Sequence, residues 1–258
     1  MTPAAAPAAV CAPAAMPPVE PVFYATTRID TFDGARGLTN ATGFFFRRAG
    51  RLFLVTSRHV MVDPKSHHHP DRVEIELHTP SADLTRTTTH SLLLYEHGLA
   101  RWRQGEDSGG PIDVAALEVD PSALGEHVRL EAFTEAHLQH ELQAVGIGEP
   151  VTILGFPLGF HDTVHRLPVA RQGAIASAFG VRFQGEGYFL TDARTHRGAS
   201  GAPVLMRQRG ASPQDPLPWK LLGVHSSRVD MRNRDRVEDD ALSLNCAWYA
   251  DILLTLTR

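Results

Sequence analysis

Short apolar runs alternate with clusters of turn-forming residues along most of the chain, and this spacing constrains the fold more than any other feature. Each run is only a few residues long, and Gly, Pro, Asp or Asn separates most runs from the next. Runs of this length suit β-strands, and many of them in one chain indicate an all-β sandwich or barrel. The predicted strands are Phe44–Phe46, Leu52–Val55, Val73–Leu77, Val114–Leu117, Val151–Leu154, Tyr188–Leu190, Val204–Leu205 and Leu221–Val224.

Helical periodicity is confined to two segments. Thr134–Leu142 could form a short helix, and Asn245–Leu256 is predicted to form a terminal one. In the second segment Trp248, Ile252 and Leu256 recur at a helical spacing that places them on one face.

Composition excludes several classes of function. The 258 residues carry a net charge of -4, so no basic surface for nucleic acid or an anionic membrane is indicated. No run approaches the roughly 18 apolar residues that a membrane-spanning helix needs. Residues 1–21 are rich in Ala and Pro and are expected to be disordered. They have neither a basic start nor an unbroken apolar stretch, so a cytoplasmic location is the expectation.

Three segments carry residues suited to nucleophilic catalysis. An apolar strand is followed by His59, Asp113 opens a second apolar strand, and Ser200 stands between Gly198 and Gly201 before a third. A serine hydroxyl becomes a useful nucleophile when an imidazole accepts its proton and a buried carboxylate orients that imidazole. A glycine before the serine allows the N–H groups of Gly198 and Ser200 to converge on one oxyanion.

The order His59, Asp113, Ser200 resembles that of the trypsin-like (chymotrypsin-fold) serine peptidases. The motifs around it are similar to those of the bacterial HtrA-type peptidases, and the resemblance spans roughly residues 22–229. Those motifs are Thr42-Gly43-Phe44-Phe45, Leu154-Gly155-Phe156-Pro157, Thr191-Asp192-Ala193, Gly198-Ala199-Ser200-Gly201-Ala202-Pro203 and Leu222-Gly223-Val224-His225-Ser226.

The resemblance implies two six-stranded antiparallel β-barrels with the active site between them, followed by a C-terminal α-helix. The expected divisions are a tail at 1–21, a first barrel at 22–130, a second barrel at 131–238 and the helix at 239–258. It implies a serine endopeptidase with a protein or peptide substrate, the catalytic residues His59, Asp113 and Ser200, and an oxyanion hole at Gly198 and Ser200. No metal or organic cofactor is implied.

The chain departs from the family pattern in two places. Arg58 precedes the catalytic histidine where alanine is usual, and too few residues follow the second barrel for the appended peptide-binding module of the HtrA type. In digestive relatives an aspartate directly before the nucleophile pairs with a freed N-terminus. Here that position is Ala199, so activity without propeptide cleavage is expected.

The primary specificity pocket is expected to involve Thr195, His225 and Ser226. Arg194 stands at the pocket-base position, so an Arg/Lys preference of the trypsin type is disfavoured. A threonine and a histidine at these positions are similar to those of glutamyl endopeptidases, and of viral cysteine proteases that read glutamine. The resemblance implies a preference for Glu, or Gln, before the scissile bond. The alternative is that His225 is a packed strand residue and that the pocket takes small apolar side chains.

The remaining motifs have simpler interpretations. His67-His68-His69 lies between prolines and fits an exposed loop better than a zinc site. His161 and His165, and likewise His137 and His140, are expected to be solvated. Cys11 and Cys246 could pair, although one bridge is atypical of secreted scaffolds.

Two rival functions share the same residues. One is a catalytically inert relative that binds peptides or scaffolds a complex, and the intact triad argues against it. The other is an esterase for small acyl groups, which would use the same chemistry. Relative kcat/KM on a peptide and on an acyl ester separates esterase from peptidase.

Overall fold

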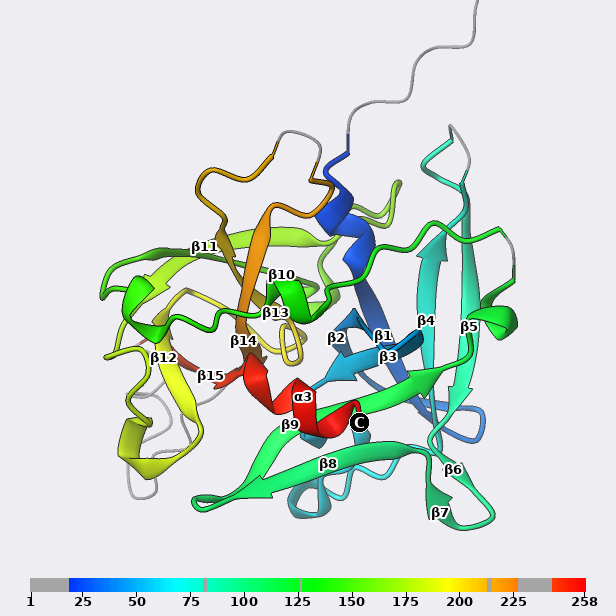
Figure 1. Ribbon diagram of the computed structural model, residues 1–258. Coiled ribbons are helices and arrows are strands. Elements are labelled where there is room, and N and C mark those ends of the chain that lie inside the picture. Colours follow the sequence, from blue (N-terminus) through cyan, green and yellow to red (C-terminus); the bar gives the residue numbers. More distant parts are fainter. Residues whose placement is uncertain (1–18, 81–82, 126, 213–214, 227–242) are drawn as a thin grey trace, which may run out of the picture.

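The computed structural model describes residues 19–80, 83–125, 127–212, 215–226 and 243–258, and β-strands dominate them. The strands form a seven-stranded sheet and a closed barrel. Figure 1 shows the barrel strands on the left and the sheet on the right, with the C-terminal residues lying across the boundary near β9. The expected all-β architecture in two halves is confirmed.

The N-terminal half is an antiparallel sheet with the order β5-β4-β1-β2-β3-β9-β8. Each hairpin joins neighbours in this order, and β1 also pairs with β4 through the register Ile29 to Ile75. Its strands are β1 (Thr26–Asp33), β2 (Arg36–Arg48), β3 (Arg51–Thr56), β4 (Arg72–His78), β5 (Thr87–Leu93), β8 (Trp102–Asp107) and β9 (Gly110–Val119), with a small separate pair β6 (Tyr95–Glu96) and β7 (Leu99–Ala100).

The C-terminal half closes into a barrel with the order β10-β11-β12-β15-β14-β13. Its strands are β10 (Pro150–Gly155), β11 (Val169–Ile175), β12 (Tyr188–Asp192), β13 (Pro203–Arg207), β14 (Trp219–Ser226) and β15 (Leu244–Tyr249). Helical elements in the described residues are short: α1 (Arg58–Met61), α3 (Leu253–Leu256) and 3₁₀ turns at Pro21–Ala25, Pro64–Ser66, Pro121–Leu124, Glu135–His137, Leu142–Ala144, Pro157–Gly159, Phe183–Gly185 and Ala250–Ile252.

A continuous hydrophobic cluster joins the two halves. Phe44 and Phe53 of the sheet pack in it with Leu205 and Trp248 of the barrel. Phe45 points to the opposite face of β2 and belongs to the interior of the N-terminal half. Strand β2 is therefore buried on both faces, as its unbroken Phe run indicates, and this burial holds the two halves against each other.

The main sheet of the N-terminal half has seven strands, where a barrel of six was expected. The segment Trp102–Asp107 is polar apart from Trp102, so its apolar content does not mark it as a strand. It nevertheless pairs with β9 as an edge strand, with Trp102 buried and Gln104 exposed. Edge pairing supplies the backbone hydrogen bonds that a short polar segment needs.

The predicted helix over Asn245–Leu256 is wrong in its first half. Leu244–Tyr249 forms β15, paired with both β12 and β14, and only Leu253–Leu256 is α-helical. Cys246 and Trp248 face the cluster between the halves, whereas Ala247 packs inside the barrel. Burial on alternate faces and two ladders of hydrogen bonds stabilise a strand where the apolar spacing suggested a helix.

The possible helix over Thr134–Leu142 is likewise reduced to two 3₁₀ turns. Leu138 is extended and forms an isolated bridge with Leu221 of the barrel. Its backbone N–H ends the 3₁₀ turn by donating to the Glu135 carbonyl, and the chain then runs beside the barrel instead of continuing as a helix.

Candidate active site

The register between β3 and β9 brings His59 to Asp113. Thr56, the last residue of β3, pairs with Ala115 of β9, and Asp113 lies two residues before Ala115 on the same strand. The chain then turns into α1, which carries His59 back over that strand. His59 donates its backbone N–H to Asp113 Oδ1 (2.9 Å), and its Nδ1 lies 2.7 Å from Asp113 Oδ2. With Nδ1–H as the donor, the lone pair of the imidazole is on Nε2.

The barrel contributes a third contact to the same carboxylate. Ser226, the last residue of β14, donates from Oγ to Asp113 Oδ2 over 2.8 Å. One residue earlier, the His225 carbonyl accepts a hydrogen bond from Ser57 Oγ at 3.3 Å. The end of β14 thus contacts the segments that carry His59 and Asp113. The sequence predicts Ser226 as a residue of the specificity pocket, and the structure shows that its hydroxyl contacts Asp113.

Ser200 lies in a tight turn directly before β13. It is 5% exposed, and its carbonyl accepts the Thr42 N–H at 3.0 Å. The next residue, Gly201, donates its N–H to the His225 carbonyl at 2.8 Å. Ser200 is therefore fixed on one side by β2 and on the other by the same end of β14 that contacts Asp113.

Both glycines of this turn have positive φ, 91° at Gly198 and 84° at Gly201. A Cβ at Gly198 would lie 2.5 Å from the Phe156 carbonyl oxygen, and one at Gly201 would overlap the Thr42 carbonyl and the Thr56 hydroxyl. Backbone conformation and space both require glycine here.

The peptide between Arg197 and Gly198 has a defined orientation. The Arg197 carbonyl accepts the Leu158 N–H at 2.5 Å. Because C=O and N–H point to opposite sides of a trans peptide, the Gly198 N–H is directed away from Leu158.

The expected pocket residues Thr195 and His225 lie in different environments. Thr195 Oγ1 donates to Asn245 Oδ1 at 2.7 Å, and Asn245 Nδ2 donates to the carbonyls of Ala193 and Ser243. Sequence reasoning missed Asn245, because a polar residue within an apolar run gives no spacing signal.

His225 is completely buried, and neither of its ring nitrogens has a hydrogen-bond partner among the described residues. Burial, with a smaller effect from His59, lowers the pKa of His225 to about 3, so its imidazole is neutral at physiological pH. Arg194 and Arg197 are exposed at the surface. Ser227 and Arg228, which follow Ser226 in the sequence, lie outside the described residues.

Arg58, which departs from the family pattern, has a local partner. Its Nε donates to Gln104 Oε1 at 2.6 Å, and Gln104 lies on the additional strand β8. Arg58 is therefore hydrogen-bonded to β8, the additional strand of the sheet.

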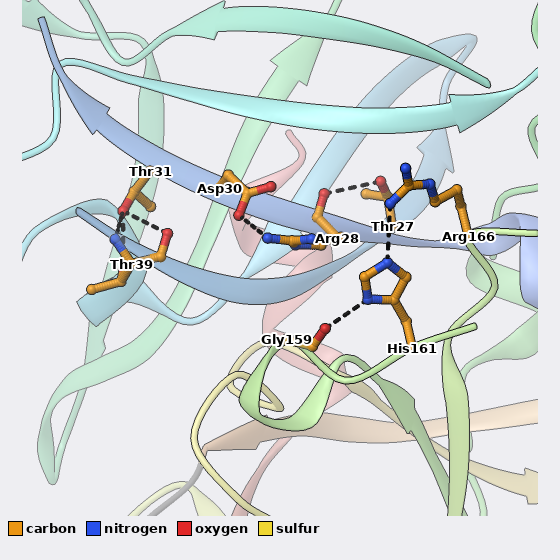
Figure 2. A network of polar contacts seen from close by, with 8 residues as sticks. All are labelled: Thr27, Arg28, Asp30, Thr31, Thr39, Gly159, His161 and Arg166. Atoms are coloured by element: carbon orange, nitrogen blue, oxygen red, sulfur yellow. Dashed lines mark hydrogen bonds and ion pairs between the residues drawn. The ribbon is translucent and has the colours of Figure 1, made fainter. Parts of the chain in front are cut away.

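Three of the other histidines have hydrogen-bond partners nearby, and His161, which the sequence predicts to be solvated, is buried. His68 Nε2 lies 3.0 Å from the Val60 carbonyl, and His165 Nδ1 lies 2.7 Å from Asp162 Oδ2. Figure 2 shows His161 with Nδ1 on the Gly159 carbonyl at 2.6 Å and Nε2 facing Arg166.

Within the described ranges, no group of three or more His, Cys, Asp or Glu side chains has metal-binding geometry. Cys246 is a free, buried thiol, and Cys11 falls outside these ranges. None of the described helices has the length and apolar character to cross a membrane.

Known proteins share the family and the fold of this chain. The sequence matches the trypsin-like peptidase domain family over residues 41–211. An inactive mutant form of Rv3671c from M. tuberculosis H37Rv has a similar structure, with a TM-score of 0.51 and 16% identity over 97% of this chain and 94% of that one.

A serine endoprotease from Yersinia pestis gives a TM-score of 0.52 at 13% identity; the match covers 93% of this chain and 66% of that one. No curated protein sequence gives a significant match. At such identities the two structures support the fold alone, and the family match covers more than half of the sequence. The chain belongs to the trypsin-like peptidase domain family and is a serine-type peptidase.

Proposed function

We propose that the protein is a serine endopeptidase in which Ser200 attacks the scissile carbonyl, His59 accepts its proton, and Asp113 orients His59. The observation that carries this proposal is the double contact between His59 and Asp113, made through the backbone N–H and Nδ1 of the histidine. With the proton on Nδ1, the free lone pair is on Nε2. General-base catalysis by His59 requires this tautomer.

Two backbone N–H groups would stabilise the tetrahedral intermediate. Gly198 and Ser200 are proposed for this role, because both belong to the turn before β13 and the Leu158–Arg197 hydrogen bond directs the Gly198 N–H away from Leu158. Collapse of the intermediate would release the amine with the proton held by His59, and water would then hydrolyse the acyl-enzyme.

Labelling by a peptidyl phosphonate, which reacts with an activated serine, tests this assignment. We expect stoichiometric labelling of the wild-type protein and none of Ser200→Ala. His59→Ala should remain folded and lower kcat by several orders of magnitude, since only the oxyanion hole and substrate binding remain. An unlabelled, folded wild type would favour the inert peptide-binding relative, and hydrolysis of acyl esters without peptides would favour the esterase.

We further propose that the pocket prefers Glu or Gln before the scissile bond. The support is His225, a fully buried imidazole whose two ring nitrogens are both unpartnered among the described residues. Leaving such groups unpaired is costly, and a substrate side chain that bonds to them would recover that cost. The neutral imidazole offers one N–H donor to a carbonyl or carboxylate oxygen.

The hydrogen-bond directions favour Gln over Glu. Asn245 uses its amide N–H groups on two carbonyls, so its oxygen must accept from Thr195. The Thr195 hydroxyl then has only acceptor capacity left, which suits the amide N–H of Gln and repels a carboxylate. A carboxylate would also bring a negative charge into a buried site, and burial disfavours the protonated His225 that would best balance that charge.

Fluorogenic peptides that differ only in the residue before the scissile bond test this preference. We expect the highest kcat/KM for Gln, then Glu, and a selective loss of both in His225→Ala. The proposal is wrong if Gln, Glu and Asp peptides are all cleaved more slowly than Ala, Val or Leu peptides. That result would assign His225 to packing within β14.

A further inference from the structure

Thr42 is bonded to the nucleophile turn through both its side chain and its backbone. Its Oγ1 donates to the Gly198 carbonyl at 2.7 Å and accepts the Phe156 N–H at 3.0 Å. Its own N–H donates to the Ser200 carbonyl at 3.0 Å. Thr42 is completely buried in β2, in the opposite half of the molecule from the turn that it contacts.

The proton of the Thr42 hydroxyl has a single destination. Because the Phe156 N–H can only donate, it occupies a lone pair of Oγ1, and the hydroxyl proton is directed to the Gly198 carbonyl. The peptide after Gly198 is therefore fixed by Thr42, and the peptide before it is fixed by Leu158. A glycine with φ of 91° has little intrinsic preference for one conformation, so these two bonds select it.

Among the described residues, few other bonds fix the Gly198 end of this turn. Ala199 has no charge for an ion pair, and its N–H donates to the His196 carbonyl within the same segment. Space around the Thr42 hydroxyl is limited, since a Cβ built on Gly155 would lie 2.7 Å from it. If valine replaced Thr42, its methyl group would occupy the place of the hydroxyl and exclude water, so the Gly198 carbonyl and the Phe156 N–H would both lose a buried partner.

We propose that Thr42 is a positioning residue whose hydroxyl fixes the orientation of the Gly198 N–H for oxyanion stabilisation. This inference rests on the proposed function of the turn. In this proposal, a side chain of the N-terminal half aligns the Gly198 N–H, which belongs to the barrel half. The oxyanion hole is then complete only when the two halves are packed together.

The direct test compares Thr42→Val, which keeps the shape and removes the hydroxyl, with Thr42→Ser, which keeps the hydroxyl. In Thr42→Val we expect kcat to fall by up to about 10²–10³-fold, the loss that follows removal of one oxyanion donor. KM should stay close to the wild-type value, and Thr42→Ser should restore most of kcat. If Thr42→Val does not fold, Thr42→Cys with its weak S–H donor replaces it and should fall between Ser and Val.

Thr31→Val is the matched control. Thr31 is also completely buried, and its hydroxyl likewise accepts a backbone N–H and contacts a carbonyl, both from Thr39 (Figure 2). Its loss should lower the free energy of unfolding by a comparable amount and leave kcat unchanged. An equal loss of kcat in Thr31→Val would mean that general destabilisation, and not alignment of Gly198, explains the effect.

A crystal structure of Thr42→Val gives a readout that does not depend on activity. We expect the Arg197–Gly198 peptide to rotate, so that the Arg197 carbonyl leaves the Leu158 N–H. An unrotated peptide, or wild-type kcat in Thr42→Val, overturns the inference. A wild-type protein that phosphonate does not label would contradict the proposed function instead, and the two failures are thereby distinguished.

Discussion

Asp113 illustrates at the scale of single residues how one carboxylate can organise a site. Its two oxygens accept from the backbone N–H of His59, the ring of His59 and the hydroxyl of Ser226. Hydrogen bonds to a charged acceptor are stronger than those between neutral groups. The carboxylate therefore determines both the position of the imidazole and the ring nitrogen that carries the proton.

Asp113→Asn should separate these two roles. The amide has nearly the same shape, but its NH₂ group would face the histidine and favour the tautomer with the proton on Nε2. We expect kcat to fall by about 10⁴-fold, as such a tautomer change does in serine proteases. Peptide affinity, measured by calorimetry in a Ser200→Ala background, should be nearly unchanged. A kcat close to wild type would remove Asp113 from the catalytic assignment.

At the scale of elements, the turn before β13 is the most constrained segment of the site. A side chain at Gly201 would meet both unfavourable φ and overlap with Thr42 and Thr56. Gly210 provides a matched comparison, because it has a similar φ of 70° and no atom within 4 Å of the point that a Cβ would occupy.

Gly201→Ala and Gly210→Ala should therefore differ sharply in urea unfolding. We expect Gly210→Ala to lose about 1–2 kcal/mol, the cost of left-handed backbone for an L-residue. Gly201→Ala should lose more, because overlap with Thr42 and Thr56 is added, and should also lose phosphonate labelling. Equal losses would show that the turn can relax around an added methyl group.

The elements also show what sequence patterns can and cannot predict. Segments such as Leu52–Val55 and Leu221–Val224 are recognisable as strands because burial on both faces requires an unbroken run of apolar residues. The segment at Asn245 is not, because its apolar spacing fits a helix as well as a strand between two neighbours. Thr42, Asn245 and the Ser226 hydroxyl have no recognisable role in the sequence, because long-range hydrogen bonds depend on which strands meet in space.

At the scale of the whole molecule, buried histidines connect stability to pH. Burial lowers the pKa of His225 to about 3 and also lowers the pKa values of His137 and His90. In the unfolded chain these groups titrate near pH 6.5. Below that pH the unfolded state binds more protons than the folded state. The contribution of these neutral histidines to the free energy of unfolding is therefore fully present above about pH 6.5 and is lost as the pH falls toward 3.

Unfolding by urea between about pH 4 and pH 7 measures this dependence. The wild type should lose stability steadily on acidification, and His225→Gln, which cannot be protonated, should show a shallower slope. His140→Gln, a substitution at an exposed position, is the control and should retain the wild-type slope. An identical slope in His225→Gln would mean that His225 is protonated to the same extent in both states.

The last two residues of β14 have a consequence for protein engineering. Through backbone and hydroxyl groups, His225 and Ser226 contact Gly201, Ser57 and Asp113, in the segments proposed to carry the nucleophile, the base and the carboxylate. The His225 ring is proposed to contact the substrate. Grafting a pocket from another peptidase onto this scaffold would therefore disturb turnover together with selectivity. A library that redesigns substrate choice should keep the main chain of β14 and the Ser226 side chain fixed, and vary position 225 together with Thr195 and Asn245.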